Sequence, residues 1–240
     1  GPWGLLQPVA DALKLLQKED IVPRDADPAL FNIAPPLTVF CALSALALVP
    51  VGPEWIVADL HIGVLFALAM GSLAVFPVWM AGWASNNKYA LLGGMRAAAQ
   101  SISYEIPLLL SATVPIILAD SFRITDIVNA QLGGNWFALW PPGPGIAAFA
   151  LFFLCSLAEA NRIPFDIPEA ESELVSGVST EYTGMKWGLF QLAEYLHTFI
   201  ISLVATTLFL GGWDGPGDND GIIWMAIKSL TLFAGIFWIR

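Results

Sequence analysis

Long apolar segments alternate with short polar ones along the whole chain. Six of the apolar segments are long enough, or nearly so, to cross the roughly 30 Å of hydrocarbon in a bilayer as α-helices. We place them at about 30–50, 62–83, 104–119, 144–160, 187–211 and 222–240. No segment shows the two-residue alternation of a transmembrane β-strand. The pattern therefore predicts an all-α, polytopic bundle of transmembrane helices that forms a single membrane domain over residues 1–240.

The basic residues between these segments are unevenly distributed. Eight of the ten lie on one side of the predicted bundle: Lys14, Lys18, Arg24, Lys88, Arg96, Arg162, Lys186 and Arg240. The opposite side contains only Arg123, and Lys228 falls within the last apolar segment. The loops on that opposite side are 51–61, 120–143 and 212–221. Because cytoplasmic loops are enriched in lysine and arginine, we expect residues 1–29 and the loops at 84–103 and 161–186 to be cytoplasmic.

Composition agrees with a membrane protein and argues against other classes. The 240 residues are 57% hydrophobic and 12% charged, with a mean hydropathy of +0.69; a soluble domain carries about twice as many charges. The net charge of −10 argues against a nucleic-acid partner. Cys41 and Cys155 lie singly in apolar segments, so we expect no iron–sulfur, zinc or haem c site. The chain begins at Gly1 without methionine and stops at Arg240 after an apolar segment, so we expect a longer parent protein.

Residues 3–19, WGLLQPVADALKLLQKE, have the pattern of an amphipathic helix. Apolar side chains recur in it at three- and four-residue spacing: Leu6, Val9, Leu13 and Leu16. Such a helix can lie along the membrane surface with Trp3 at the lipid headgroups. It serves either as a plain surface anchor or as one wall of an opening through which a lipid-soluble molecule enters.

The stretch at 85–106 is polar at both ends and rich in small residues in the middle. Gly93 and Gly94 would allow another segment to pack closely against a helix there. Arg96 and Glu105 are nine residues apart, which is two and a half helical turns. They would not pair with each other, so we expect each to have another partner.

The segment PFDIPEAESELVSG holds four acids and no base. Helix capping explains the first two acids, because Asp166 can cap a helix that has Pro168 in its first turn and Glu169 at the capping-box position. Capping leaves Glu171 and Glu173 unexplained. Glu173 also shares a helix face with Glu169, where like charges cost roughly 0.2–0.5 kcal/mol. Either the loop is exposed and water solvates these acids, or the carboxylates have a function.

Several ionisable residues lie inside the predicted spans or at their ends. Glu194 lies about seven residues into the fifth segment, roughly 10 Å deep, and His197 is one turn further on the same side. Glu105 and Glu159 lie at the ends of the third and fourth segments, and Lys228 lies near the middle of the last. An ionisable group at such depth costs at least a few kcal/mol, so it marks a candidate functional site. For Glu194 a structural ion pair with Lys228 is the alternative, and His197 is either a member of this series or simply packed.

Five stretches together resemble one known family. They are GPWGLLQPVADALKLLQKE (1–19), SNNKYALLGGMRAAAQSISYE (85–105), AEANRIPFDIPEAESELVSGVSTEYTGM (158–185), AEYLH (193–197) and LFLGGW (208–213). In this order they resemble the quinone-site membrane subunit of respiratory complex I, which is the family of the H subunit of NADH-quinone oxidoreductase, called subunit 1 in mitochondria. The resemblance covers nearly the whole chain, with small departures such as Ile167 where the family usually has leucine. The family has at least one further span at each end, which agrees with the expected longer parent protein.

The resemblance implies a subunit of a proton-translocating NADH:quinone oxidoreductase in the inner (plasma) membrane of a bacterium. The cytoplasmic loops would form a chamber that admits ubiquinone or menaquinone as substrate, while the chain itself would bind no cofactor. Electrons would come from an iron–sulfur cluster of a neighbouring subunit. The implied partners are the lipid bilayer and the other complex I subunits, namely the peripheral-arm quinone-site and iron–sulfur subunits, the small membrane subunits and the antiporter-like subunits.

The resemblance also implies roles for individual residues. The proton path would consist of six acids: Glu105, Glu159, Glu169, Glu171, Glu181 and Glu194. The quinone chamber and its loop would include Trp3, Lys88, Arg96, Arg162, Asp166 and Glu173. Movement of the loop at 161–186, bounded by Pro164, Pro168 and Gly177, would transmit the charge change of quinone reduction to the acids.

Two other functions share some of these features. The membrane anchor of a related energy-converting [NiFe] hydrogenase or of a ferredoxin- or F420-linked complex has similar spans and often lacks a quinone site. The complete SNNKY and PFDIPEAESELV stretches favour the quinone enzyme. A stand-alone proton-coupled transporter would also bury acids, but no internal repeat relates the two halves of the chain.

Overall fold

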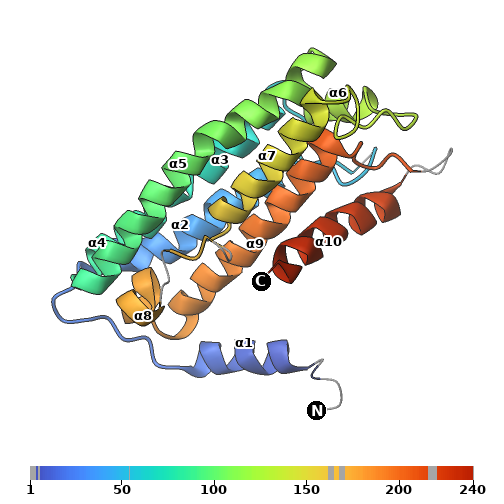
Figure 1. Cartoon of the computed structure of the whole chain (residues 1–240). Helices are drawn as coiled ribbons and strands as arrows, with labels where there is room; N and C mark the ends of the chain where they lie inside the picture. The colour runs from blue at the N-terminus through green and yellow to red at the C-terminus, as the bar shows by residue number, and fades with distance from the viewer. Residues whose placement is uncertain are drawn as a thin grey trace. The chain divides into compact units, whose positions relative to one another are not determined.

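The computed structural model describes residues 4, 6–53, 55–161, 165–167, 171–215 and 221–239, and of Glu171 and Ser172 it describes the backbone alone. Within these residues the secondary structure is helical apart from an isolated bridge between Gly52 and Trp55. The elements are α1 (Gln7–Gln17), α2 (Pro28–Leu46), α3 (Gly63–Leu73), α4 (Val75–Ala84), α5 (Lys88–Ala119), α6 (Ile124–Asn129), α7 (Pro144–Glu159), α8 (Glu171–Leu174), the short 3-10 helix η2 (Gly177–Glu181), α9 (Gly184–Phe209) and α10 (Ile222–Trp238) (Figure 1).

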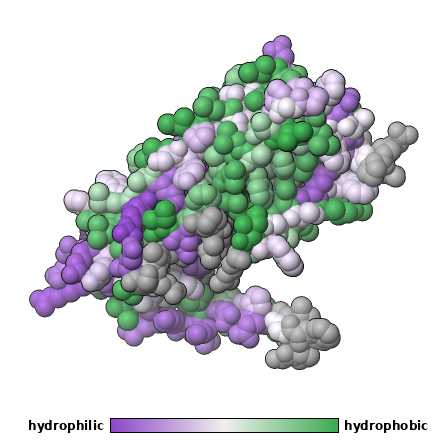
Figure 2. Space-filling view, viewed as in Figure 1, coloured by the Kyte–Doolittle hydropathy of each residue, from purple (hydrophilic) through white to green (hydrophobic). Residues whose placement is uncertain are grey.

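The apolar helices confirm the predicted all-α, polytopic membrane bundle. Among the described residues, four helical stretches are long and apolar enough to cross a membrane: Pro28–Leu46, Gly63–Ala84, Lys88–Ala119 and Gly184–Phe209. Two shorter apolar helices, α7 and α10, coincide with the fourth and sixth predicted segments. Hydrophobic side chains cover much of the visible surface of the long helices in Figure 2. On α5 an exposed apolar stripe runs along one face and suits contact with lipid: Ile102, Ile106, Leu110 and Ile117.

Two helix boundaries differ from the sequence-based expectation. The segment expected at 104–119 is the second half of α5, which begins much earlier, at Lys88. Asn87 caps this helix, since its side-chain oxygen accepts the backbone N–H of Tyr89 at 2.9 Å. The segment expected at 62–83 is divided into α3 and α4 at Ala74. Pro77 explains the break, because a proline ring clashes with the carbonyl four residues earlier, here that of Leu73.

Packing contacts divide the chain into two compact units. The first unit contains residues 1–40, 74–98 and 167–195. The second contains residues 41–73, 99–166 and 196–240. Helices α2, α5 and α9 each contribute residues to both units.

The core of the first unit is built around an aromatic stack. The rings of Phe31 and Tyr182 lie parallel with their centroids 4.1 Å apart, and Phe190 meets Tyr182 edge-on at 4.9 Å. The ammonium group of Lys186 lies 5.1 Å from the Phe31 ring centroid and 2.8 Å from an Asp20 carboxylate oxygen. Burial raises the pKa of the Tyr182 hydroxyl above its usual range. These contacts tie the start of α9 to α2 and to the segment that follows α1.

Helix α1 leaves its apolar side uncovered by the rest of the chain. The four predicted apolar positions are all exposed: Leu6, Val9, Leu13 and Leu16. Lys14 lies in the last turn, where a cation suits the helix dipole. The amphipathic helix predicted for 3–19 is thus found at 7–17, with a free apolar face of the kind that enters a membrane surface.

In the second unit, a buried glutamine organises the polar groups at the end of α9. The amide nitrogen of Gln131 donates to the carbonyls of Thr207 and Leu208 at 3.0 and 3.2 Å. Its amide oxygen accepts the N–H groups of Phe137 and Gly211, both at 3.1 Å. From α10, the Lys228 ammonium also donates to backbone carbonyls here, those of Leu210, Gly212 and Asp214. These bonds satisfy carbonyls that a helix end leaves without an intrahelical partner.

Candidate functional site

Glu105 lies on α5 in the second unit, and its carboxylate accepts a hydrogen bond from the hydroxyl of Ser72 on α3. Ser72 is the last residue but one of α3, so Glu105 lies beside the break before α4. The spacing of Arg96 and Glu105 predicted that each has its own partner, and Ser72 is the partner of Glu105. A hydroxyl group can donate to an ionised carboxylate and accept from a carboxylic acid, so this contact is compatible with either form of Glu105.

Glu159 ends α7 and pairs with His197 on α9. Nε2 of His197 lies 3.4 Å from Oε1 of Glu159, and the two side chains are only 18% and 16% exposed. Gly71 of α3 adjoins both. A Cβ placed on Gly71 would lie 3.3 Å from the Glu159 oxygen and 3.6 Å from Cε1 of His197.

The structure therefore brings two of the predicted acids to adjacent residues of one helix. Glu105 contacts Ser72, and the Glu159–His197 pair borders Gly71. Glu194 lies three residues before His197 on α9, which is about one helical turn. The end of α3 is thus a place in the second unit where two carboxyl groups and an imidazole converge.

A buried amide holds the start of the acid-rich loop in the second unit. Gln100 is 7% exposed, and its nitrogen lies 2.7 Å from the carbonyl oxygens of both Ala158 and Phe165 and 3.3 Å from Oδ1 of Asn161. Asp166 follows directly after Phe165. Sequence reasoning missed Gln100, although an amide in an alanine-rich helical stretch is the kind of signal that could have indicated it.

In the first unit, the loop after α7 contacts the beginning of α5 in antiparallel order. Nη1 of Arg96 lies 2.6 Å from a carboxylate oxygen of Glu173. One turn earlier, a Cβ on Gly93 would lie only 2.8 Å from Cα of Gly177. Asn87 donates its side-chain N–H to Glu181 at 2.5 Å. Contacts at successive turns of one helix fix the register of the loop, and they confirm that Arg96 has a partner other than Glu105.

Glycines permit this close packing on two sides of α5. Gly93 meets the backbone of Gly177 and Val178, as described above. Gly94 meets the opposite neighbour, α4, with its Cβ position 3.5 Å from Cα of Gly82. The predicted role of Gly93 and Gly94 in close packing is confirmed, with a loop as one of the two partners.

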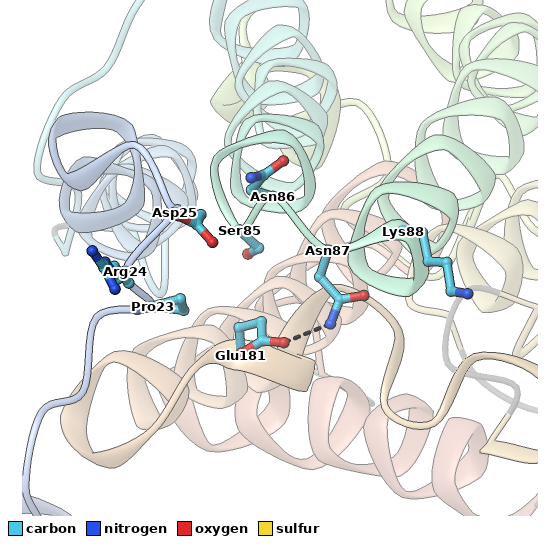
Figure 3. Close-up of a pocket in the computed structure, with 8 residues that line it drawn as sticks. All are labelled: Pro23, Arg24, Asp25, Ser85, Asn86, Asn87, Lys88 and Glu181. Atoms are coloured by element: carbon cyan, nitrogen blue, oxygen red, sulfur yellow. Dashed lines mark hydrogen bonds between the residues drawn. The ribbon is translucent and has the colours of Figure 1, made fainter.

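A polar pocket of about 460 Å³ lies in the first unit beside the Asn87–Glu181 contact. Its lining consists of Pro23, Arg24, Asp25, Ser85, Asn86, Asn87, Lys88 and Glu181. In Figure 3 the Asn87 amide faces Glu181, while the Lys88 side chain points away from the other labelled residues. An adjoining cavity of about 610 Å³ shares Asp25 and Lys88 and extends to Trp83 and Leu91. Of the residues predicted for a substrate chamber, Lys88 lines both cavities.

Some predicted residues lie outside the described part of the chain: Trp3, Arg162, Pro164, Pro168 and Glu169. The capping interpretation of Asp166 depends on two of them. Glu171 begins α8, but its side chain is not among those described. Gly177 begins η2 with φ +54°, a conformation that favours glycine.

Comparison with known proteins gives one consistent result. The NADH dehydrogenase family matches residues 1–240. The chain is 46% identical to the H subunit of NADH-quinone oxidoreductase from Rhodospirillum rubrum over 246 residues, which cover 100% of this chain and 72% of the relative. It is 47% identical to H subunit 2 of NADH-quinone oxidoreductase from Geobacter sulfurreducens over 249 residues, covering 100% of this chain and 74% of the relative. It is also 47% identical to the H subunit of NADH-quinone oxidoreductase from Geobacillus thermodenitrificans over 243 residues, covering 100% and 72%.

Proposed function

The chain belongs to the NADH dehydrogenase family as a membrane subunit of respiratory complex I, and on this premise we propose that it forms the quinone chamber and passes protons through its buried acids. The observation that carries the proposal is the convergence of Glu105 and Glu159 on adjacent residues of α3. A hydroxyl and an imidazole can each hydrogen bond to a carboxyl group in either of its protonation states. A purely structural role would call for fixed ion pairs with lysine or arginine.

In this mechanism the chain supplies shape and proton chemistry, and its partners supply electrons. A quinone enters from the bilayer, accepts electrons from an iron–sulfur subunit and takes up protons as it becomes quinol. The negative charge that develops before protonation attracts protons from nearby carboxylic acids. Glu105, Glu159 and Glu194 then exchange protons with one another and with the adjoining membrane subunits.

The loop after α7 is proposed to connect the chamber with these acids. Its contacts with Asn87 and Arg96 lie on the early turns of α5, while Glu105 lies further along the same helix. A change of charge at Glu173 or Glu181 therefore acts on the helix that carries Glu105. We place this loop and α1 on the cytoplasmic side of a bacterial inner membrane, because the basic residues are concentrated there.

The proposal is tested by replacing Glu105 and Glu159 singly with glutamine in the assembled complex. Glutamine has the shape of glutamic acid but cannot release a proton. We expect each variant to assemble and to lose at least about a hundredfold in coupled quinone reduction and proton pumping, a usual scale for loss of a proton-transfer group. The measurements are NADH-dependent quinone reduction and acidification of membrane vesicles.

A matched control uses an acid outside the proposed path. Asp59 pairs with Arg123 on a connecting loop of the second unit, and Asp59→Asn should keep both rates at the parent level. If Glu105→Gln and Glu159→Gln both pump at the parent rate, these acids do not carry protons and the proposed path is wrong.

A further inference from the structure

We propose that His197 is the proton-exchange partner of Glu159, in a pair that Gly71 allows to form. This inference rests on the proposed function, because it adds a histidine to a path otherwise made of carboxylic acids. His197 lies on α9 and Glu159 at the end of α7, so two different helices set their separation of 3.4 Å. Imidazole is the side chain best suited to take up and release a proton near neutral pH.

Proton exchange within the pair leaves its net charge unchanged. Transfer of one proton from Nε2 of the imidazolium to Oε1 of the carboxylate leaves a neutral imidazole and a neutral carboxylic acid. The sum of the two charges is zero before and after this step. Since both side chains are mostly buried, a step that leaves no isolated charge avoids the desolvation cost of a lone ion. As the carboxylic acid passes its proton to the next acceptor, His197 takes up a proton from the preceding donor, so the pair returns to imidazolium and carboxylate with its net charge unchanged.

Gly71 provides the room for this pair. A methyl group at position 71 would lie 3.3 Å from Oε1 of Glu159 and 3.6 Å from Cε1 of His197, directly beside the pair. The first distance is closer than ordinary van der Waals contact, so the carboxylate would have to move by a few tenths of an ångström. Glycine is less favourable than alanine within a helix, and here its missing side chain leaves room for Glu159 and His197.

Other titratable groups lie along the helices that carry or adjoin the pair. Glu194 lies about one turn before His197 on α9, and Cys155 lies one turn before Glu159 on α7. From α3, Ser72 leads to Glu105. Because these sites interact, the pH dependence of activity reports the group of sites and not one residue.

The test compares pH profiles in the assembled complex. NADH-dependent quinone reduction and proton pumping are measured in membrane vesicles between pH 6 and 9 for the parent, His197→Gln and Gly71→Ala. Glutamine cannot carry a positive charge, and a nearby positive charge favours the ionised form of a carboxyl group. We expect the His197→Gln profile to move toward alkaline pH by on the order of one unit. A histidine that only packs or hydrogen bonds would lower the rate by the same factor at every pH.

Gly71→Ala keeps every titratable group and changes only the geometry of the pair. It should displace the profile in the same direction by a smaller amount. Gly235→Ala on α10 is the matched control, because a Cβ there meets no atom within 4 Å. Its profile should coincide with that of the parent.

The outcomes separate this inference from the proposed function. If His197→Gln keeps the pH profile of the parent while Glu159→Gln is impaired, the inference is wrong and the acid path stands. Parent-like pumping by Glu159→Gln also refutes the inference, and parent-like pumping by both Glu105→Gln and Glu159→Gln overturns the path itself. If His197→Gln does not assemble, Gly71→Ala decides, and an unshifted profile in that variant refutes the role of the pair.

Discussion

Gly93→Ala tests how closely the acid-rich loop must lie against α5. A Cβ at position 93 would lie 2.8 Å from Cα of Gly177 and 2.9 Å from both its carbonyl carbon and the nitrogen of Val178. These are backbone atoms, which cannot turn away as a flexible side chain can. The nearest distance falls about 0.6 Å short of the 3.4 Å at which ordinary contact begins. The loop backbone must therefore separate from the helix.

The size of the effect follows from two opposing terms. Overpacking of this kind costs roughly 1–3 kcal/mol, and clashes with backbone belong at the upper end of that range. Alanine gains about 1 kcal/mol over glycine within a helix. The net cost of about 2 kcal/mol would reduce the equilibrium for docking of the loop about 30-fold, since 1.36 kcal/mol corresponds to a factor of ten.

Hydrogen–deuterium exchange of the assembled complex measures this docking. Peptides that cover 177–182 should lose protection by on the order of 30-fold in Gly93→Ala, and coupled quinone reduction should fall with it. Gly235→Ala, which adds a methyl group in open space on another helix, should leave exchange at 177–182 unchanged. Parent-like protection of 177–182 in an assembled Gly93→Ala complex would show that this contact does not hold the loop.

Two further predictions concern stability in the second unit. Hydrogen bonding to Arg123 lowers the pKa of Asp59 below its ordinary 3.8. Asp59→Asn should therefore lower the free energy of unfolding by up to about 1 kcal/mol at neutral pH. Thermal unfolding at several pH values should show this difference vanish as pH falls below 3.8 through the folded-state pKa. Gln131→Leu leaves the buried N–H groups of Phe137 and Gly211 without their acceptor. It should destabilise the subunit by roughly 3 kcal/mol in thermal unfolding, and a loss under about 0.5 kcal/mol would contradict the role of Gln131.

Hydropathy located the apolar helices but not the full extent of α5 or the break after α3. Hydropathy detects the length of chain that lipid can cover, whereas a helix extends as far as its caps and packing allow. Residues 88–103 contain arginine, glutamine and serine, so they have a loop-like hydropathy. They are helical because Asn87 caps them and because Gly93 and Gly94 pack against other segments. Pro77, which separates α3 from α4, was visible in the sequence. Whether such a proline breaks a membrane helix depends on whether neighbouring helices satisfy the backbone group that it leaves without a hydrogen bond.

Contacts between candidate residues depend on partners that spacing along one helix cannot identify. Spacing along one helix correctly predicted that Arg96 and Glu105 have different partners, but it could not identify them. Those partners, Glu173 and Ser72, are distant in the sequence and meet only in the fold. The amide of Gln100 stood out locally in an alanine-rich stretch, but its three acceptors lie about sixty residues later and could not be identified. A single sequence carries no signal for contacts of that range.

The partners divide the acids into two groups with different chemistry. Glu173 faces a guanidinium group and Glu181 an amide, and Glu173 is 59% exposed. Such contacts hold a loop in place, and water screens much of their charge. Glu105 and Glu159 face a hydroxyl and an imidazole, groups that can stay neutral when the acid gains a proton. Under the proposed function, Glu173 and Glu181 hold the loop in register, and Glu105 and Glu159 transfer protons. A variant of Arg96 should accordingly alter loop docking more than the pH profile of activity. A variant of His197 should alter the pH profile of activity more than loop docking.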